Sequence, residues 1–176
     1  MAILNKQDIT IALGRLGELA QSHDLNIELL LLGGSLMVLE FGTRDSTRDV
    51  DVVILQPTEI AGVRALVKII ADERSWAEDW LNDAAKGFMV GITQGPIIFS
   101  GPGITVRRPA IKQLLAMKLC AWRDDIDIAD ARRLLQELTG SRDDIWQKIV
   151  PHLLRGQELK ARYAFDDLWE DIYGSH

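Results

Sequence analysis

The chain has few of the residues that build disulfide frameworks or zinc sites. It holds a single cysteine, Cys120, among its 176 residues, so an intramolecular disulfide is excluded. The three histidines, His23, His152 and His176, are far apart and show neither the spacing of metal ligands nor that of a serine-type catalytic triad. The chemistry of this protein must therefore rest on other side chains.

Long apolar segments and a secretory leader are also missing. The longest apolar stretch, near residues 29–41, is interrupted by Gly33, Gly34 and Glu40. The start, MAILNKQDI, lacks the basic region, apolar run and cleavage site of a signal peptide. Cys120 lies in an apolar helical pattern that is typical of a buried, reduced thiol. We therefore expect a cytoplasmic protein with no membrane segment.

Basic residues are outnumbered by acidic ones. Lysine and arginine total 20 against 26 aspartates and glutamates, which gives a formal net charge of -6. Broad, non-specific binding to nucleic acid needs a basic footprint, so this balance argues against it. A local cluster is still compatible with a small anionic ligand, although ordinary surface charge explains the same residues: Arg44, Arg48, Arg107, Arg108, Lys112, Lys118 and Arg123.

What remains is the composition of one compact protein. Apolar residues make up 47% of the chain and charged residues 26%. The periodicity predicts an α/β core over residues 1–108, followed by a helical part over 109–176 that packs on it. Asp8 is the predicted cap of the first helix, and residues 75–88 read as helical or partly irregular. The predicted strands are 29–32, 50–55, 96–100 and 103–106, and the predicted helices are 8–21, 57–70, 109–122, 127–139, 143–154 and a last one ending near 173.

The most informative motif joins the first two strands of the core. Gly33-Gly34-Ser35 follows a buried strand and begins a helix, and Thr47-Arg48-Asp49-Val50-Asp51 leads into the next strand. Strand side chains alternate, so Asp49 and Asp51 share a face and can hold one or two hard divalent cations. Mg²⁺ is the natural candidate, with Mn²⁺ as the alternative.

The glycines suit phosphate chemistry. Gly33 and Gly34 let the backbone approach a triphosphate, and the helix that follows presents amides to it. Ser35 can add a hydroxyl and Arg48 a positive charge. An ordinary strand-to-helix turn, with the two aspartates paired to Arg44 or Arg48, explains the same residues without a function. The glycine turn and two carboxylates on one face, taken together, favour the functional interpretation.

These residues carry a family resemblance. The order of strand, Gly33-Gly34-Ser35, helix and then Asp49-Val50-Asp51 resembles the minimal nucleotidyltransferase fold of the DNA polymerase β superfamily. Two later runs, 80–88 (WLNDAAKGF) and 114–119 (LLAMKL), resemble bacterial nucleotidyltransferases related to AbiEii-type toxins of toxin–antitoxin systems. The resemblance implies a small mixed sheet flanked by helices, followed by a helical part, and a Mg²⁺-dependent transferase that binds an NTP.

The resemblance also assigns residues beyond the core motif. In the superfamily a third carboxylate usually comes from a later strand, but the matching strand here, residues 103–107 (GITVR), has none. The related toxins complete the site with a downstream lysine and aspartate, which match Lys118 and, more loosely, Asp127 or Asp130, with Asp127 preferred. Lys118 would bind the β- or γ-phosphate. A lysine at a helix margin and an aspartate capping a helix are the structural alternatives.

The expected activity is transfer of a nucleoside monophosphate from an NTP to a hydroxyl on RNA, a protein or a small molecule. The expected catalytic residues are Asp49, Asp51, Lys118 and Asp127. An antitoxin protein is a further expected partner, from the resemblance alone. The competing interpretation is a nucleotidyltransferase fold that has lost turnover and serves as a nucleotide-binding or partner module. Asn82 and Asp83 would cap a turn or touch a ligand.

Overall fold

The computed structural model describes residues 3–174, and the chain divides into two compact units. Unit 1 comprises the chain up to Gly87 together with Gln94–Pro109, and unit 2 comprises Phe88–Thr93 together with the chain from Ala110 onward. The sequence-based division at 108/109 did not anticipate that Phe88–Thr93 belongs with the helical part. Among residues 3–174, no helix is long and apolar enough to span a membrane.

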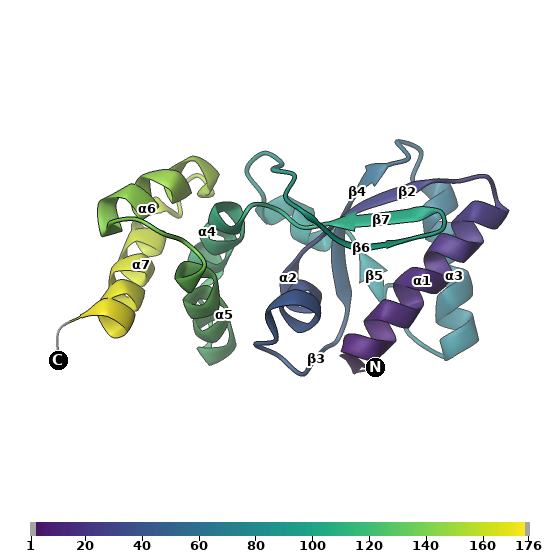
Figure 1. The fold of residues 1–176 in the computed structure, drawn as a ribbon, viewed down its shortest axis with the longest axis horizontal. Helices are drawn as coiled ribbons and strands as arrows, with labels where there is room; N and C mark the ends of the chain where they lie inside the picture. The colour runs from purple at the N-terminus through teal and green to yellow at the C-terminus, as the bar shows by residue number, and fades with distance from the viewer. Residues whose placement is uncertain (1–2, 175–176) are drawn as a thin grey trace. The chain divides into compact units, whose positions relative to one another are not determined.

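Unit 1 is built on a mixed five-stranded sheet in the order β5-β4-β2-β7-β6 (Figure 1). Strand β2 pairs antiparallel with β4 and parallel with β7, β7 pairs antiparallel with β6, and β4 pairs parallel with β5. The predicted α/β core is confirmed at this level. The strand bounds are β2 Ile27–Leu31, β4 Val50–Gln56, β5 Leu81–Asn82, β6 Ile97–Gly101 and β7 Ile104–Arg107.

Helices α1 (Lys6–Ser22) and α3 (Ala61–Arg74) pack against each other, and α1 also contacts β6 and β7. The short helix α2 (Gly33–Leu36) continues into a π-helix, η1 (Met37–Phe41), so the predicted helix after the glycines is present. Asp8 is not the cap of α1, contrary to the prediction. Asn5 is the cap, because its side-chain oxygen accepts from the Asp8 backbone N–H. The Asp8 carboxylate in turn accepts from the Asn5 backbone N–H, which completes a capping box.

A two-stranded ribbon, β1 (Leu4–Asn5) with β3 (Ser46–Thr47), was not predicted. Two residues are too few to show a period of two, so no sequence pattern identifies such strands. The ribbon ties the loop before the two aspartates to the start of α1, because Thr47 pairs with Leu4 and Ser46 with Asn5.

Residues 75–88 contain no α-helix. The segment forms a turn, the short strand β5 and a 3-10 helix, η2 (Ala84–Phe88). Trp80 is buried, and its indole Nε1–H donates to the Val67 carbonyl of α3 at 3.0 Å. Trp76 packs edge-on against Trp80, with 5.4 Å between ring centroids. The two tryptophans therefore anchor β5 to α3.

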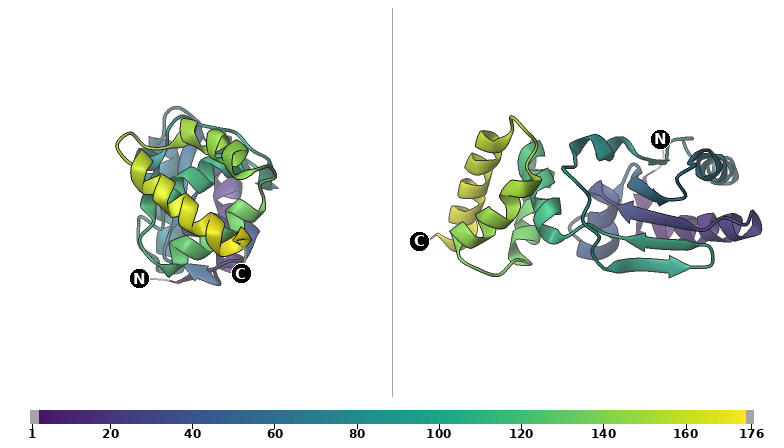
Figure 2. Two further views of the ribbon diagram at one scale, coloured as in Figure 1. Left: turned by 90° about the vertical axis from the view of Figure 1, so that its left-hand side faces the viewer. Right: turned by 90° about the horizontal axis from the view of Figure 1, so that it is seen from above.

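Unit 2 is helical, as predicted, with α6 and α7 forming its C-terminal end (Figure 2). Buried Gln113 explains why Phe88–Thr93 belongs to it: its amide accepts from the Thr93 backbone N–H at 3.0 Å and donates to the Val90 and Gly91 carbonyls. Cys120 is buried, as expected, and burial raises the pKa of its thiol. The elements are α4 Ile111–Ala121, α5 Asp125–Gln136, α6 Arg142–Ile149, the 3-10 helix η3 Val150–His152 and α7 Glu158–Tyr173.

Candidate functional site

The glycine turn lies where three strand ends of unit 1 meet. Because β2 and β4 are antiparallel, the carboxyl end of β2 lies beside the start of β4, with Leu31 opposite Val52. Strand β7 runs parallel to β2, so its last residue, Arg107, lies at the same end of the sheet, opposite Leu30. The Leu32 N–H donates to the Asp51 carbonyl at 2.8 Å, which fixes the turn to the start of β4.

Both glycines are required by close neighbours. Gly33 has a φ of +60°, and a Cβ on it would collide with the Asp51 carboxylate. A Cβ on Gly34 would lie 2.7 Å from the Thr47 hydroxyl oxygen and 3.1 Å from an Arg44 guanidinium nitrogen. The turn is thus lined by a carboxylate, a hydroxyl and a guanidinium, all against bare backbone.

The two aspartates come from the start of β4. Asp51 is the second residue of β4, and Asp49 precedes the strand directly; both are half-buried. Asp49 Oδ2 accepts a hydrogen bond from the Asn82 amide, Nδ2, at 3.3 Å. Asn82 is paired with Asp51 across β4 and β5. Of the two alternatives from the sequence, the structure shows the turn cap, because Asn82 Oδ1 accepts from the Ala84 N–H at 2.9 Å. Contact between Asn82 and a ligand stays a prediction.

Two other predicted nucleotide-binding residues, Ser35 and Arg48, differ from each other in burial. Ser35 is fully buried, and its hydroxyl donates to the Leu32 carbonyl at 2.9 Å. A bond from Ser35 to a phosphate would replace that contact. Arg48 is exposed, directly before Asp49.

Strand β7 carries no carboxylate. The strand ends in Arg107, whose guanidinium Nε lies 2.8 Å from Glu28 Oε1. Arg108 follows and pairs with Glu40 of η1 at 3.0 Å. Two arginines with carboxylate partners therefore stand at the end of β7 and directly after it.

Lys118, Asp127 and Asp130 form a compact cluster within unit 2. The Lys118 ammonium lies 3.1 Å from Asp127 Oδ1 and 2.8 Å from Asp130 Oδ2, and both aspartates are almost fully buried. Asp127 is not the helix cap, because Asp124 caps α5 by accepting from the Asp127 N–H at 3.0 Å. The structure thus joins the lysine to both candidate aspartates.

The electrostatics around Asp127 favour its charged form. Burial acts to raise the pKa of Asp127, but Lys118, together with Arg123 at 3.2 Å, outweighs it and holds that pKa below its usual value. Asp127 is therefore ionised at neutral pH.

The carboxylates fit a magnesium ion. Among residues 3–174, no group of three or more His, Cys, Asp or Glu side chains is placed to hold a metal. Mg²⁺ does not require such a cage, because proteins commonly bind it through one or two carboxylates, with waters and substrate phosphates as the other ligands. Asp49 and Asp51 are two carboxylates of the kind that such a site uses.

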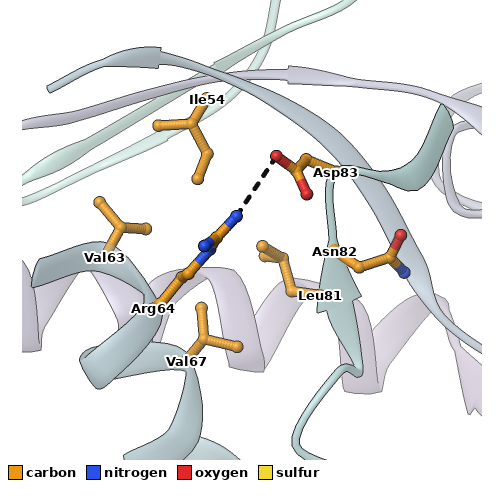
Figure 3. A pocket seen from close by; sticks show the side chains of 7 residues that line it. All are labelled: Ile54, Val63, Arg64, Val67, Leu81, Asn82 and Asp83. Atoms are coloured by element: carbon orange, nitrogen blue, oxygen red, sulfur yellow. Dashed lines mark ion pairs between the residues drawn. The ribbon is translucent and has the colours of Figure 1, made fainter. Parts of the chain in front are cut away.

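A pocket in unit 1 shares one residue, Asn82, with the candidate site. It is formed by α3, β4 and β5, and Figure 3 shows Arg64 reaching towards Asp83 across it, at 3.7 Å. Ile54 lines this pocket, and the odd spacing from Asp51 puts its side chain on the opposite face of β4. The pocket's lining residues are Ile54, Val63, Arg64, Val67, Leu81, Asn82 and Asp83.

Comparison of the chain with models of protein families, with curated proteins and with solved structures gave no match. The function must therefore be argued from the residues themselves.

Proposed function

We propose that this protein is a Mg²⁺-dependent nucleotidyltransferase with the nucleotidyltransferase fold, moving a nucleoside monophosphate from an NTP to a hydroxyl on RNA, a protein or a small molecule. One observation carries the proposal. The Asp51 carboxylate, the Thr47 hydroxyl and the Arg44 guanidinium converge on two glycines whose backbone a side chain would obstruct. A metal-binding carboxylate and hydrogen-bond donors around bare backbone are what a metal–triphosphate requires.

Each candidate site residue of unit 1 has a role in this proposal. Asp49 and Asp51 supply hard oxygen ligands, and Gly33 and Gly34 admit phosphate oxygens to the backbone. Arg48, exposed beside Asp49, attracts the anionic substrate. When bound, Mg²⁺ neutralises charge on the phosphate oxygens and makes the acceptor hydroxyl easier to deprotonate. The acceptor hydroxyl would lose its proton to solvent, and its oxygen would bond to the α-phosphorus. The bond between the α-phosphorus and the oxygen that bridges it to the β-phosphorus would break, and pyrophosphate would leave.

The role of unit 2 rests on the family resemblance. Lys118 would bind the β- or γ-phosphate and Asp127 would take part in catalysis, as their counterparts do in the related toxins. Their mutual ion pair supports a fixed, charged lysine at this position. A toxin role, with an antitoxin protein as partner, is proposed on the same resemblance.

A second candidate is a nucleotide-binding or partner module without turnover. The observation that favours it is the end of β7, where Arg107 paired with Glu28 stands in place of the third carboxylate. This candidate keeps the glycine turn and the two aspartates but has no transfer reaction.

Label transfer separates the two candidates. Each of the four [α-³²P]NTPs is incubated with total RNA and with cell protein, in Mg²⁺ or Mn²⁺, using wild type, Asp51→Asn and the control Asp45→Asn, which changes an exposed aspartate of the same loop. We expect labelling by wild type and Asp45→Asn, and more than about a 100-fold loss in Asp51→Asn, since it removes a metal ligand. Equal labelling by Asp51→Asn would refute the mechanism, and no labelling by folded wild type would favour the second candidate.

A further inference from the structure

The run Trp80-Leu81-Asn82-Asp83 connects the core of unit 1 to the carboxylates. Trp80 is fixed by its bond to Val67 of α3, and its carbonyl accepts from the Val50 N–H at 2.6 Å. Leu81 is buried, and Asn82 follows it in register with Asp51. Partners in a parallel ladder project to the same face, so Asn82 lies on the face that carries Asp51. The tryptophan therefore sets where the Asn82 amide stands.

The orientation of that amide is fixed by its own segment. Asn82 Oδ1 accepts from the Ala84 backbone N–H at 2.9 Å, and Nδ2 donates to the Asp79 carbonyl at 3.4 Å. These two contacts decide which end of the amide is the donor, independently of Asp49. The remaining Nδ2–H then points to Asp49 Oδ2 at 3.3 Å. The donor is thus in place before any ligand arrives.

We infer that Asn82 is a positioning residue, which holds Asp49 in the orientation that binds the metal. By fixing Oδ2, the amide fixes the direction of the other carboxylate oxygen. Groups that orient a metal ligand typically contribute about 10- to 100-fold to metal affinity. This inference rests on the proposed function, because it requires that Asp49 and Asp51 bind a divalent cation.

Binding of Mn²⁺ alone, followed by electron paramagnetic resonance, tests this role without depending on turnover. The variants are Asn82→Ala, Asn82→Ser, Asp49→Asn, the double variant of Asn82→Ala with Asp49→Asn, Asp51→Asn and the control Asp83→Asn. Serine keeps an oxygen for the turn at Ala84 but lacks the amide donor. Asp83 neighbours Asn82 and pairs instead with exposed Arg64. Urea unfolding of each variant reports whether the fold persists.

We expect Asn82→Ala and Asn82→Ser to weaken Mn²⁺ binding about tenfold and Asp83→Asn to leave it unchanged. In the Asp49→Asn background, Asn82→Ala should cause no further loss, because its effect passes through Asp49. Wild-type affinity in both Asn82 variants, or losses that multiply in the double variant, would overturn the inference while leaving the metal site intact. Wild-type affinity in Asp51→Asn would instead overturn the proposed function, and the inference with it.

Discussion

At the scale of single residues, Gly33 is the position at which backbone conformation and a close neighbour both require glycine. Its positive φ suits glycine, and the Asp51 carboxylate occupies the space in which a Cβ would stand. The sequence predicted a glycine turn next to two aspartates, but not that Thr47 and Arg44 close over Gly34. Those contacts depend on the unpredicted ribbon of β1 and β3, which holds the loop in place. Periodicity cannot reveal such a ribbon, because each strand has only two residues.

Gly33→Ala tests whether this close approach is essential. Gly42 is the matched control, since its φ is +65° but no atom lies within 4 Å of a Cβ placed there. We expect Gly42→Ala to lower the free energy of unfolding by about 1 kcal/mol, from backbone strain alone. Gly33→Ala should cost about 1 to 3 kcal/mol more, because the new methyl group must displace Asp51. Urea unfolding measures both values, and equal losses would show that the contact with Asp51 has no energetic consequence.

At the scale of elements, helices α4 and α5 are joined by a buried ion-pair cluster. The sequence suggested that Asp127 caps a helix, since aspartate is common at that position. The cap is Asp124, three residues earlier, which leaves Asp127 facing Lys118. Sequence alone did not separate these roles, because the segment 123–130 (RDDIDIAD) offers several aspartates within one turn of the helix start.

The depressed pKa of Asp127 makes its contribution to stability pH-dependent. Its folded pKa lies below the unfolded value of about 3.9, so the contribution is present above that pH and is lost as pH falls through the folded pKa. We expect the difference in unfolding free energy between wild type and Asp127→Asn to be largest near neutral pH and to shrink below about pH 4. Urea unfolding across this range measures it. Asp125→Asn, at an exposed position in the same turn, should follow wild type; a constant difference for Asp127→Asn would contradict the account.

The sequence predicted four of the five strands of the sheet, and it missed β5, which lies in the segment read as helical or partly irregular. Strands β2 and β4 were identified because apolar runs such as residues 29–32 are buried on both faces. Residues 75–88 were read as helical or partly irregular because Trp76 and Trp80 have helical spacing, yet they pack on α3 from a turn and a strand. The antiparallel pairing of β2 with β4 is set by tertiary contacts, which the alternation of side chains does not specify.

At the scale of the whole molecule, the chain forms an α/β unit with the glycine turn and carboxylates and a helical unit with the Lys118 cluster. The segment Phe88–Thr93 belongs to the helical unit because Gln113 accepts a hydrogen bond from the Thr93 backbone N–H. The two residues are 20 positions apart in the sequence, so no local pattern predicts this bond. The net charge of -6 also applies to the whole chain, and it argues against broad, non-specific attraction to the phosphates of nucleic acid.

The position of the label in the transferred group tests the central claim most directly. Wild-type protein is incubated with Mg²⁺ and the same NTP labelled either at the α- or at the γ-phosphate, and the radioactivity joined to the acceptor is compared. Attack at the α-phosphorus predicts that the α-label enters the acceptor while the γ-label leaves in pyrophosphate. Entry of the γ-label would show phosphoryl transfer and contradict a nucleotidyltransferase.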